Sequence, residues 1–160
     1  MGDKPDKTLL IVDQYQTSHQ LEAFFERASW IFHVRNRGGK IGRLRGSAAS
    51  TNLLIGDILI HDGTPAISNE LGNVPSVWRR LFRLPERNWQ NRGLGSAMLK
   101  FAISEARERG LKSISGSVVE DSHGRLERFY VRHGFSIVAA AQPPLPNALY
   151  GISMVLDHGR

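Results

Sequence analysis

The chain has 160 residues, of which 41% are hydrophobic, and it contains no cysteine. This length suits one domain with a buried core, and the lack of cysteine excludes disulfides, thiolate nucleophiles and cysteine-bearing metal sites. Lysine and arginine outnumber aspartate and glutamate by 21 to 15, which favours anionic partners such as nucleic acid, phosphorylated cofactors or acidic substrates.

The first residues, "MGDKPDKTLLIVDQ", hold an apolar run that is too short for a signal peptide. No stretch of the sequence is long enough to span a bilayer. We therefore expect a soluble, cytoplasmic protein with no membrane partner.

The N-terminal third is predicted to form a strand, a helix and a hairpin. The run "TLLIV" (8–12) is typical of a strand, and "SHQLEAFFERAS" (18–29) has apolar residues at helical spacing. In "WIFHVRNRGGKIGRLRG" (30–46), two alternating segments flank a turn that is rich in asparagine and glycine. This pattern predicts a hairpin.

The segment "NLLIGDILIHDGTP" (52–65) is a nearly continuous apolar run, which is typical of a strand covered on both faces. Asp57 interrupts it. A buried carboxylate is costly without a partner, so Asp57 has either a structural hydrogen-bonding partner or a functional role.

A long connection, residues 62–89, follows this strand. Within it, "PSVWRRLFRL" (75–84) has apolar residues at helical spacing with arginines between them. We expect an amphipathic helix inserted in a connection that is longer than ordinary loops, and such connections are often functional.

The C-terminal half is predicted to contain a long helix that ends at Gly110, then the strand "KSISGSVV" and a short helix in "GRLERFYVRHG". The segments "FSIVAAA" and "ALYGISMVL" are expected to form a terminal pair of strands.

The start of the long helix, "NWQNRGLGS" (88–96), has no acidic residue and two glycines. Bare backbone N–H groups at a helix start form an anion site. The segment contains neither GxxxxGK[ST] nor GxGxxG, but it matches [RQ]-x-x-G-x-[GA] through Gln90, Gly93 and Gly95. A simple tight turn is the alternative explanation of the glycines.

The helix "LERFYVRHGF" (126–135) follows this turn after one helix and one strand. In this order the two motifs resemble the GNAT superfamily of acetyl-CoA-dependent N-acyltransferases, well over residues 50–156 and loosely before them. The resemblance implies one GNAT-like α/β (α+β) domain over residues 1–160, with a helical insertion at 62–89. Its mixed central sheet would have splayed parallel strands and flanking helices.

The resemblance also implies acetyl-CoA as co-substrate. Amides in the turn would hold its pyrophosphate, Gln90 would support the turn, and backbone groups of the preceding strand would bond to the pantetheine arm. The implied cofactor-binding residues are Ile58, Leu59, Ile60, Gln90, Asn91, Arg92, Gly93, Leu94, Gly95 and Ser96.

Tyr130 corresponds to the tyrosine that protonates the leaving thiolate in many members, and a phenol is a competent general acid for that step. A core aromatic residue is the alternative reading. The amine must lose a proton, and Asp57 is the candidate base, with Glu120 and Asp121 as reserves. The six histidines show no metal-ligand spacing, so no metal is expected.

The expected function is transfer of an acetyl group to an unidentified amine by direct attack in a ternary complex. The arginines of the 75–84 helix favour an acidic acceptor. In "LPERNWQ" (84–90) the proline stands two residues further from the turn than in most relatives, which supports the insertion. Exposed strand edges suggest a homodimer.

Two alternatives remain. Arginine-rich clusters at 35–45 and 79–92 suggest a basic module that binds nucleic acid, although no RNA-binding signature supports it. The other alternative is a GNAT-like sensor that binds acyl-CoA without turnover.

Overall fold

The structure is a computed structural model that describes residues 4–37, 39–60, 91–139, 145 and 147–157. The helix predicted over 75–84, the rest of the 62–89 connection and Gln90 lie outside the described residues.

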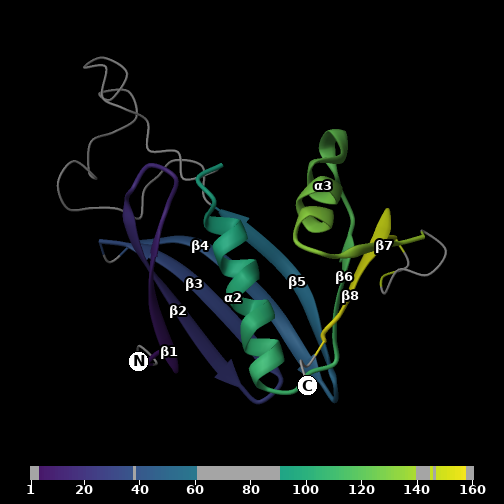
Figure 1. The fold of residues 1–160 in the computed structure, drawn as a ribbon, viewed down its shortest axis with the longest axis horizontal. Helices are drawn as coiled ribbons and strands as arrows, with labels where there is room; N and C mark the ends of the chain where they lie inside the picture. The colour runs from purple at the N-terminus through teal and green to yellow at the C-terminus, as the bar shows by residue number, and fades with distance from the viewer. Residues whose placement is uncertain (1–3, 38, 61–90, 140–144, 146, 158–160) are drawn as a thin grey trace. The chain divides into compact units, whose positions relative to one another are not determined.

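The described residues form an eight-stranded mixed sheet and two α-helices (Figure 1). Hydrogen-bonded neighbours follow the order β1-β2-β3-β4-β5-β6-β8-β7. β5 pairs with β6 in parallel, whereas the pairs β1–β2, β6–β8 and β7–β8 are antiparallel. The elements are β1 (Lys7–Val12), β2 (Ser18–Glu26), β3 (Ser29–Asn36), β4 (Gly39–Ala49), β5 (Asn52–Ile60), α2 (Leu94–Glu108), β6 (Ser113–Val118), the 3-10 turn η1 (Ser122–Gly124), α3 (Arg125–Arg132), β7 (Ser136–Val138) and β8 (Tyr150–Val155).

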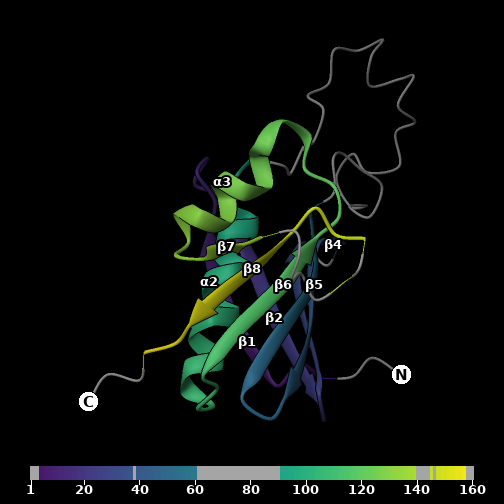
Figure 2. The ribbon, with the colours of Figure 1, turned by 90° about the vertical axis from the view of Figure 1, so that its right-hand side faces the viewer.

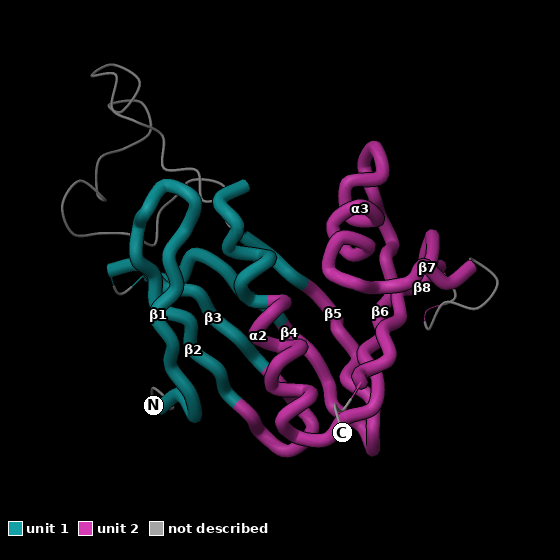
Figure 3. Tube along the Cα trace, viewed as in Figure 1, with its two compact units in different colours: residues 1–24, 31–44, 58–98 teal, residues 25–30, 45–57, 99–160 magenta. Residues whose placement is uncertain are grey.

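These elements confirm the predicted α/β class with its mixed sheet. The predicted strands, the hairpin, the long helix and the short C-terminal helix all occur, within a few residues of the expected bounds. The chain divides into two compact units (Figure 3). The first unit comprises Met1–Phe24, Ile31–Leu44 and Ile58–Met98, and the second comprises Phe25–Trp30, Arg45–Asp57 and Leu99–Arg160.

The helix predicted over residues 18–29 was wrong, because the segment forms strand β2 and the turn after it. Along β2, His19, Leu21 and Ala23 are buried and Gln20 is exposed, while Glu22, which pairs with Arg35, is also buried. A polar side chain points inward at His19, and Phe24 on the other face is apolar and partly exposed. These two exceptions hide the period of two that would have indicated a strand.

In the first unit, the start of α2 packs closely on β4 and on the end of β5. A Cβ atom at Gly42 would lie 2.7 Å from Ile60 Cδ1 and 3.5 Å from Met98 Cε. The absence of a side chain at Gly42 therefore lets the end of β5 and the first turns of α2 approach the same point of β4.

In the second unit, β6 lies between β5 and β8, and α3 contacts β7 (Figure 2). The parallel ladder consists of the four pairs from Asn52↔Ser113 to Ile55↔Gly116. Both strands continue beyond it, β5 to Ile60 and β6 to Val118. The ladder thus ends before either strand does, as expected for splayed parallel strands.

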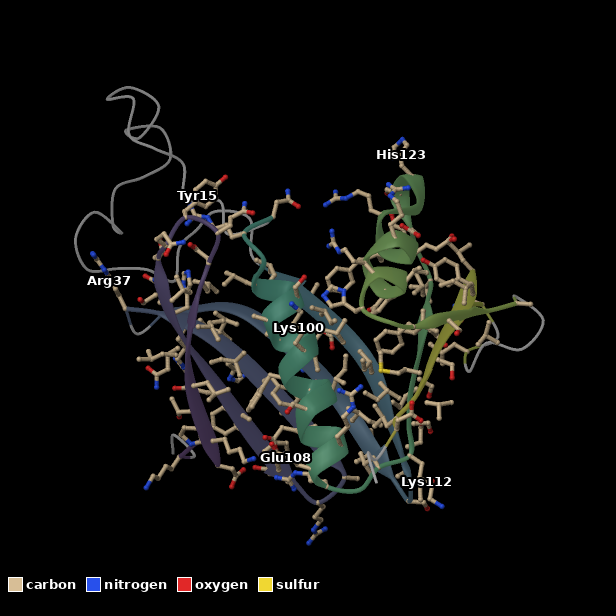
Figure 4. All side chains as sticks on the ribbon, viewed as in Figure 1. Tyr15, Arg37, Lys100, Glu108, Lys112 and His123 are labelled. Carbon is tan, nitrogen blue, oxygen red and sulfur yellow. The ribbon has the colours of Figure 1, made fainter. Side chains whose placement is uncertain are left out.

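Truncation of a core residue of α2 should destabilise the fold strongly. Leu99 is 0% exposed, so Leu99→Ala removes buried apolar atoms and leaves a cavity. We expect a loss of about 2–5 kcal/mol in the free energy of unfolding, measured by urea denaturation. The neighbouring Lys100 is exposed on the same helix (Figure 4), and Lys100→Ala should change stability by no more than about 0.5 kcal/mol. Equal effects of the two substitutions would contradict the described packing of α2.

Candidate active site

The glycine-rich turn before α2 has an unusual backbone. Asn91 and Gly93 both adopt positive φ, 56° and 84°, and the helix begins at Leu94. The amide of Ala97 donates to the Gly93 carbonyl at 3.0 Å, and the first turn of α2 contains no acidic residue. Among the described residues, no atom lies within 4 Å of the position that a Cβ would take at Gly93. The start of α2 is therefore open to an anion that seeks backbone N–H groups.

The turn between β1 and β2 holds this segment from one side. The amide of Gln14 donates to the Arg92 carbonyl at 3.2 Å, and the Gln14 side-chain amide donates to the Asn91 carbonyl. These bonds fix the two peptide units that lead into the glycine-rich turn. They join parts of the first unit that are far apart in the sequence.

The side chain of Arg92 is held by the same β1–β2 turn. Its Nη1 atom donates to Asp13 Oδ2 at 3.2 Å, and its Cζ atom lies 4.8 Å from the centre of the Tyr15 ring. Figure 4 shows Tyr15 at this turn, on the side of the view where α2 begins. The guanidinium is therefore engaged within the protein.

Asp13 is the centre of a buried hydrogen-bond network. It is 4% exposed. Its Oδ1 atom accepts from the amides of Tyr15 and Thr17, each at 2.9 Å, and its Oδ2 atom lies 2.9 Å from His19 Nε2. Burial alone would raise the pKa of Asp13, but the hydrogen bonds from His19, the two amides and Arg92 outweigh it and lower this pKa to about 2. The carboxylate is thus ionised in the folded protein at neutral pH.

The sequence analysis missed Asp13, His19 and their neighbour Asn36. The Asn36 Nδ2 atom lies 3.2 Å from His19 Nδ1 and donates to the Ser18 carbonyl at 3.3 Å. The available signal was a polar side chain at an inward strand position, His19, which was overlooked because the segment was assigned to a helix.

Tyr130 lies on α3 in the second unit and is 7% exposed. Its ring packs edge-on against Phe129 and Phe135, with ring centres 5.2 Å and 5.5 Å away. Within the described part of the chain, its hydroxyl has no hydrogen-bond partner. Burial raises the pKa of Tyr130 to about 12, so the phenol keeps its proton at neutral pH.

The three acidic candidates occupy different environments. Asp57 is partly exposed on β5, two residues after the last pair of the parallel ladder, and Glu120 is exposed after β6. Asp121 accepts from the amides of Leu126 and Glu127 at 2.8 Å and 3.0 Å and from the Tyr150 hydroxyl at 2.6 Å.

The contacts of Asp121 suit a structural role. Burial opposes ionisation, but the hydrogen bonds from Tyr150 and the two helix amides lower the pKa of Asp121 below its usual value. This carboxylate caps the start of α3, and these bonds make it a poor proton acceptor.

Metal sites and membrane-spanning helices are both absent from the described residues. No cluster of three or more His, Asp or Glu side chains in them has the arrangement of a metal site. No helix in the described part combines the length and the apolar character needed to cross a membrane.

Comparison with known proteins adds a family match. Residues 86–135 match the model described as the acetyltransferase (GNAT) family. This stretch includes the glycine-rich turn, α2, β6 and α3. No curated protein sequence matches the chain.

Solved structures show the same fold at low sequence identity. The GNAT domain of S. lividans PAT aligns with 96% of this chain and 100% of its own, with a TM-score of 0.65 and 10% identity. The PaiA N-acetyltransferase of Thermoplasma acidophilum, solved in complex with coenzyme A, aligns over 81% of this chain and 62% of its own, with a TM-score of 0.55 and 8% identity. A GNAT family acetyltransferase of Elizabethkingia anophelis, solved with acetyl-CoA bound, aligns over 81% of this chain and 77% of its own, with a TM-score of 0.52 and 17% identity.

The described residues thus have a GNAT-like α/β fold, and residues 86–135 carry the sequence pattern of the acetyltransferase (GNAT) family.

The ionisation of Asp13 predicts a specific acid sensitivity. Because the pKa of Asp13 is lower in the folded chain than its usual 3.8, its contribution to stability is present above pH 3.8 and is lost as the pH falls toward 2. A shift of this size corresponds to about 2 kcal/mol. The stability difference between the native protein and Asp13→Asn, measured by urea unfolding, should shrink by about that amount between pH 5 and pH 2. A difference that does not change over this range would contradict the network around Asp13.

Proposed function

We propose that the protein is an N-acetyltransferase that moves an acetyl group from acetyl-CoA to an amine. The observation that carries this proposal is the acid-free start of α2 behind the left-handed turn at Asn91 and Gly93, within the stretch that matches the acetyltransferase family. A helix start without acidic residues suits the pyrophosphate of coenzyme A because its N–H groups and its dipole both favour an anion.

The proposed cofactor site combines this turn with the end of β5. Amides from Asn91 to Ser96 would bind the pyrophosphate, with Gln90 supporting the turn, and backbone groups of Ile58 to Ile60 would bond to the pantetheine arm. Their proximity supports the pairing, since Ile60 and the first turns of α2 both approach Gly42 in the first unit.

The proposed chemistry is direct attack of the amine nitrogen on the thioester carbonyl. A C–N bond forms, the C–S bond breaks, and Tyr130 donates its phenolic proton to the departing sulfur. Asp57, directly or through water, takes the proton that the amine loses. The raised pKa of Tyr130 supports its role as a donor, because the phenol remains protonated until the thiolate develops.

We propose a primary amine on an acidic molecule as the acceptor, because the chain carries a net charge of +6. The arginines of the 75–84 segment that suggested this preference, Arg79 and Arg80 among them, lie outside the described residues.

Binding of the cofactor should stabilise the protein. At a concentration 100 times Kd, coenzyme A or acetyl-CoA should add about 2.7 kcal/mol to the free energy of unfolding and raise Tm by several degrees. ATP is the control, because it carries phosphates but no pantetheine arm. A Tm that responds equally to ATP and coenzyme A, or to neither, would contradict the proposed cofactor. Stabilisation without thiol release in the presence of any amine would instead favour the acyl-CoA sensor.

Removal of the Tyr130 hydroxyl should slow the chemical step. We expect Tyr130→Phe to lower kcat by about 100-fold or more, because the thiolate then leaves without a proton donor. The KM for acetyl-CoA should change little, since the ring keeps its packing against Phe129 and Phe135. Steady-state kinetics of thiol release measure both constants, and the unfolding midpoint checks that the fold is intact. A kcat equal to that of the native protein would leave Tyr130 as a core aromatic residue.

A further inference from the structure

We infer that Asp13 is a positioning residue that, through Arg92, holds the glycine-rich turn in its ligand-binding shape. This inference rests on the proposed function for the identity of the ligand, but its structural basis lies entirely in the first unit. It assigns a role to the β1–β2 turn, which no part of the proposed acetyl transfer uses directly.

The backbone of the glycine-rich turn is held by contacts from the β1–β2 turn. Asn91 has a φ of 56°, a left-handed conformation that is uncommon for residues with a side chain, although asparagine adopts it more readily than most. Gln14 binds the carbonyls of both Asn91 and Arg92, and Asp13 binds the Arg92 side chain. The β1–β2 turn therefore supplies contacts that favour this backbone conformation.

Asp13 is held in one orientation by hydrogen bonds to both of its carboxylate oxygens. A buried carboxylate is stable only when its oxygens are satisfied, and each oxygen of Asp13 has two partners. The amides of Tyr15 and Thr17 bind Oδ1, whereas His19 and Arg92 bind Oδ2. Three of these four contacts come from the β1–β2 turn and the start of β2, so Arg92 docks onto a carboxylate that is already oriented.

His19 is itself oriented by Asn36. The Asn36 amide group donates one hydrogen to the Ser18 carbonyl, which defines the direction in which its nitrogen points. Its other hydrogen then faces His19 Nδ1, which must act as the acceptor, so the ring proton lies on Nε2 and points at Asp13. Asn36, His19, Asp13 and Arg92 thus form a chain of hydrogen bonds from β3 to the glycine-rich turn.

The experiment compares Asp13→Asn with Glu22→Gln as the matched control. Glu22 pairs with Arg35 at 2.6 Å, so its variant also removes a carboxylate beside an arginine in the first unit, but away from the turn. Without ligand, Asp13→Asn should speed hydrogen–deuterium exchange of the amides from Arg92 to Ala97, while amides of β6 and all amides of Glu22→Gln keep the native rates. The Kd for coenzyme A should rise about tenfold in Asp13→Asn, a loss of about 1.4 kcal/mol of binding free energy, and should stay unchanged in Glu22→Gln.

Kinetics separate positioning from a general loss of structure. In Asp13→Asn the KM for acetyl-CoA should rise by a larger factor than the factor by which kcat falls, because the substitution leaves the reacting groups in place. If Asp13→Asn does not fold, Arg92→Met replaces it, since this side chain is 23% exposed and its loss leaves the other contacts of Asp13 in place. Arg92→Met should then show the same faster exchange without ligand.

The outcomes are distinct. Native exchange rates and a native Kd in Asp13→Asn, or native exchange in Arg92→Met where that variant replaces it, would overturn the positioning role. A native protein that binds no coenzyme A would overturn the proposed function, and in that case the exchange rates without ligand would still decide whether Asp13 holds the turn.

Discussion

The parallel pairing of β5 with β6 is the constraint on which the rest of the architecture depends. Two parallel strands cannot be joined by a tight turn, so the chain must cross over between them, and α2 is part of that crossover. The helix therefore begins after the carboxyl end of β5. In the first unit, close contact at Gly42 brings this strand end and the first turns of α2 together. The end of β5 and the start of α2 are thus adjacent for topological reasons.

This arrangement explains why backbone atoms carry most of the proposed cofactor site. Amides at a helix start and carbonyls at a strand end do not depend on side-chain identity, so the sequence needs only to keep bulk and negative charge away from them. Gly93 meets the first requirement, and the absence of acid from the first turn of α2 meets the second.

The sequence predicted the strands at 8–12 and 52–60 from their apolar runs and α2 from its apolar stripe. It failed at β2, where Leu21, Phe24, Phe25 and Ala28 stand at helical spacing although the segment forms a strand and the turn after it. The buried His19 was overlooked for that reason. It belongs to the network around Asp13, so one misassigned segment hid both the strand and the network.

Local patterns predicted the proposed anion-binding turn but not the contacts that hold it. The motif from Gln90 to Gly95 lies within six consecutive residues, whereas Asp13 and Arg92 are 79 residues apart in the sequence. Such long-range contacts follow from strand pairing, and a single misassigned strand removes them from any sequence-based account. Tyr130 was identified from its motif, but its packing between Phe129 and Phe135 required the structure.

The position of Asp13 poses an electrostatic problem that Arg92 resolves. A carboxylate near an anion site would repel the ligand, and its effect would be strong because Asp13 is buried. Its ion pair with Arg92 cancels most of that charge, while the Tyr15 ring covers the guanidinium. The pair therefore fixes the backbone of residue 92 at little electrostatic cost to the site. In the proposed site, the affinity for the pyrophosphate would come from amides that are held in place, and such a preorganised site loses little conformational entropy when the ligand binds.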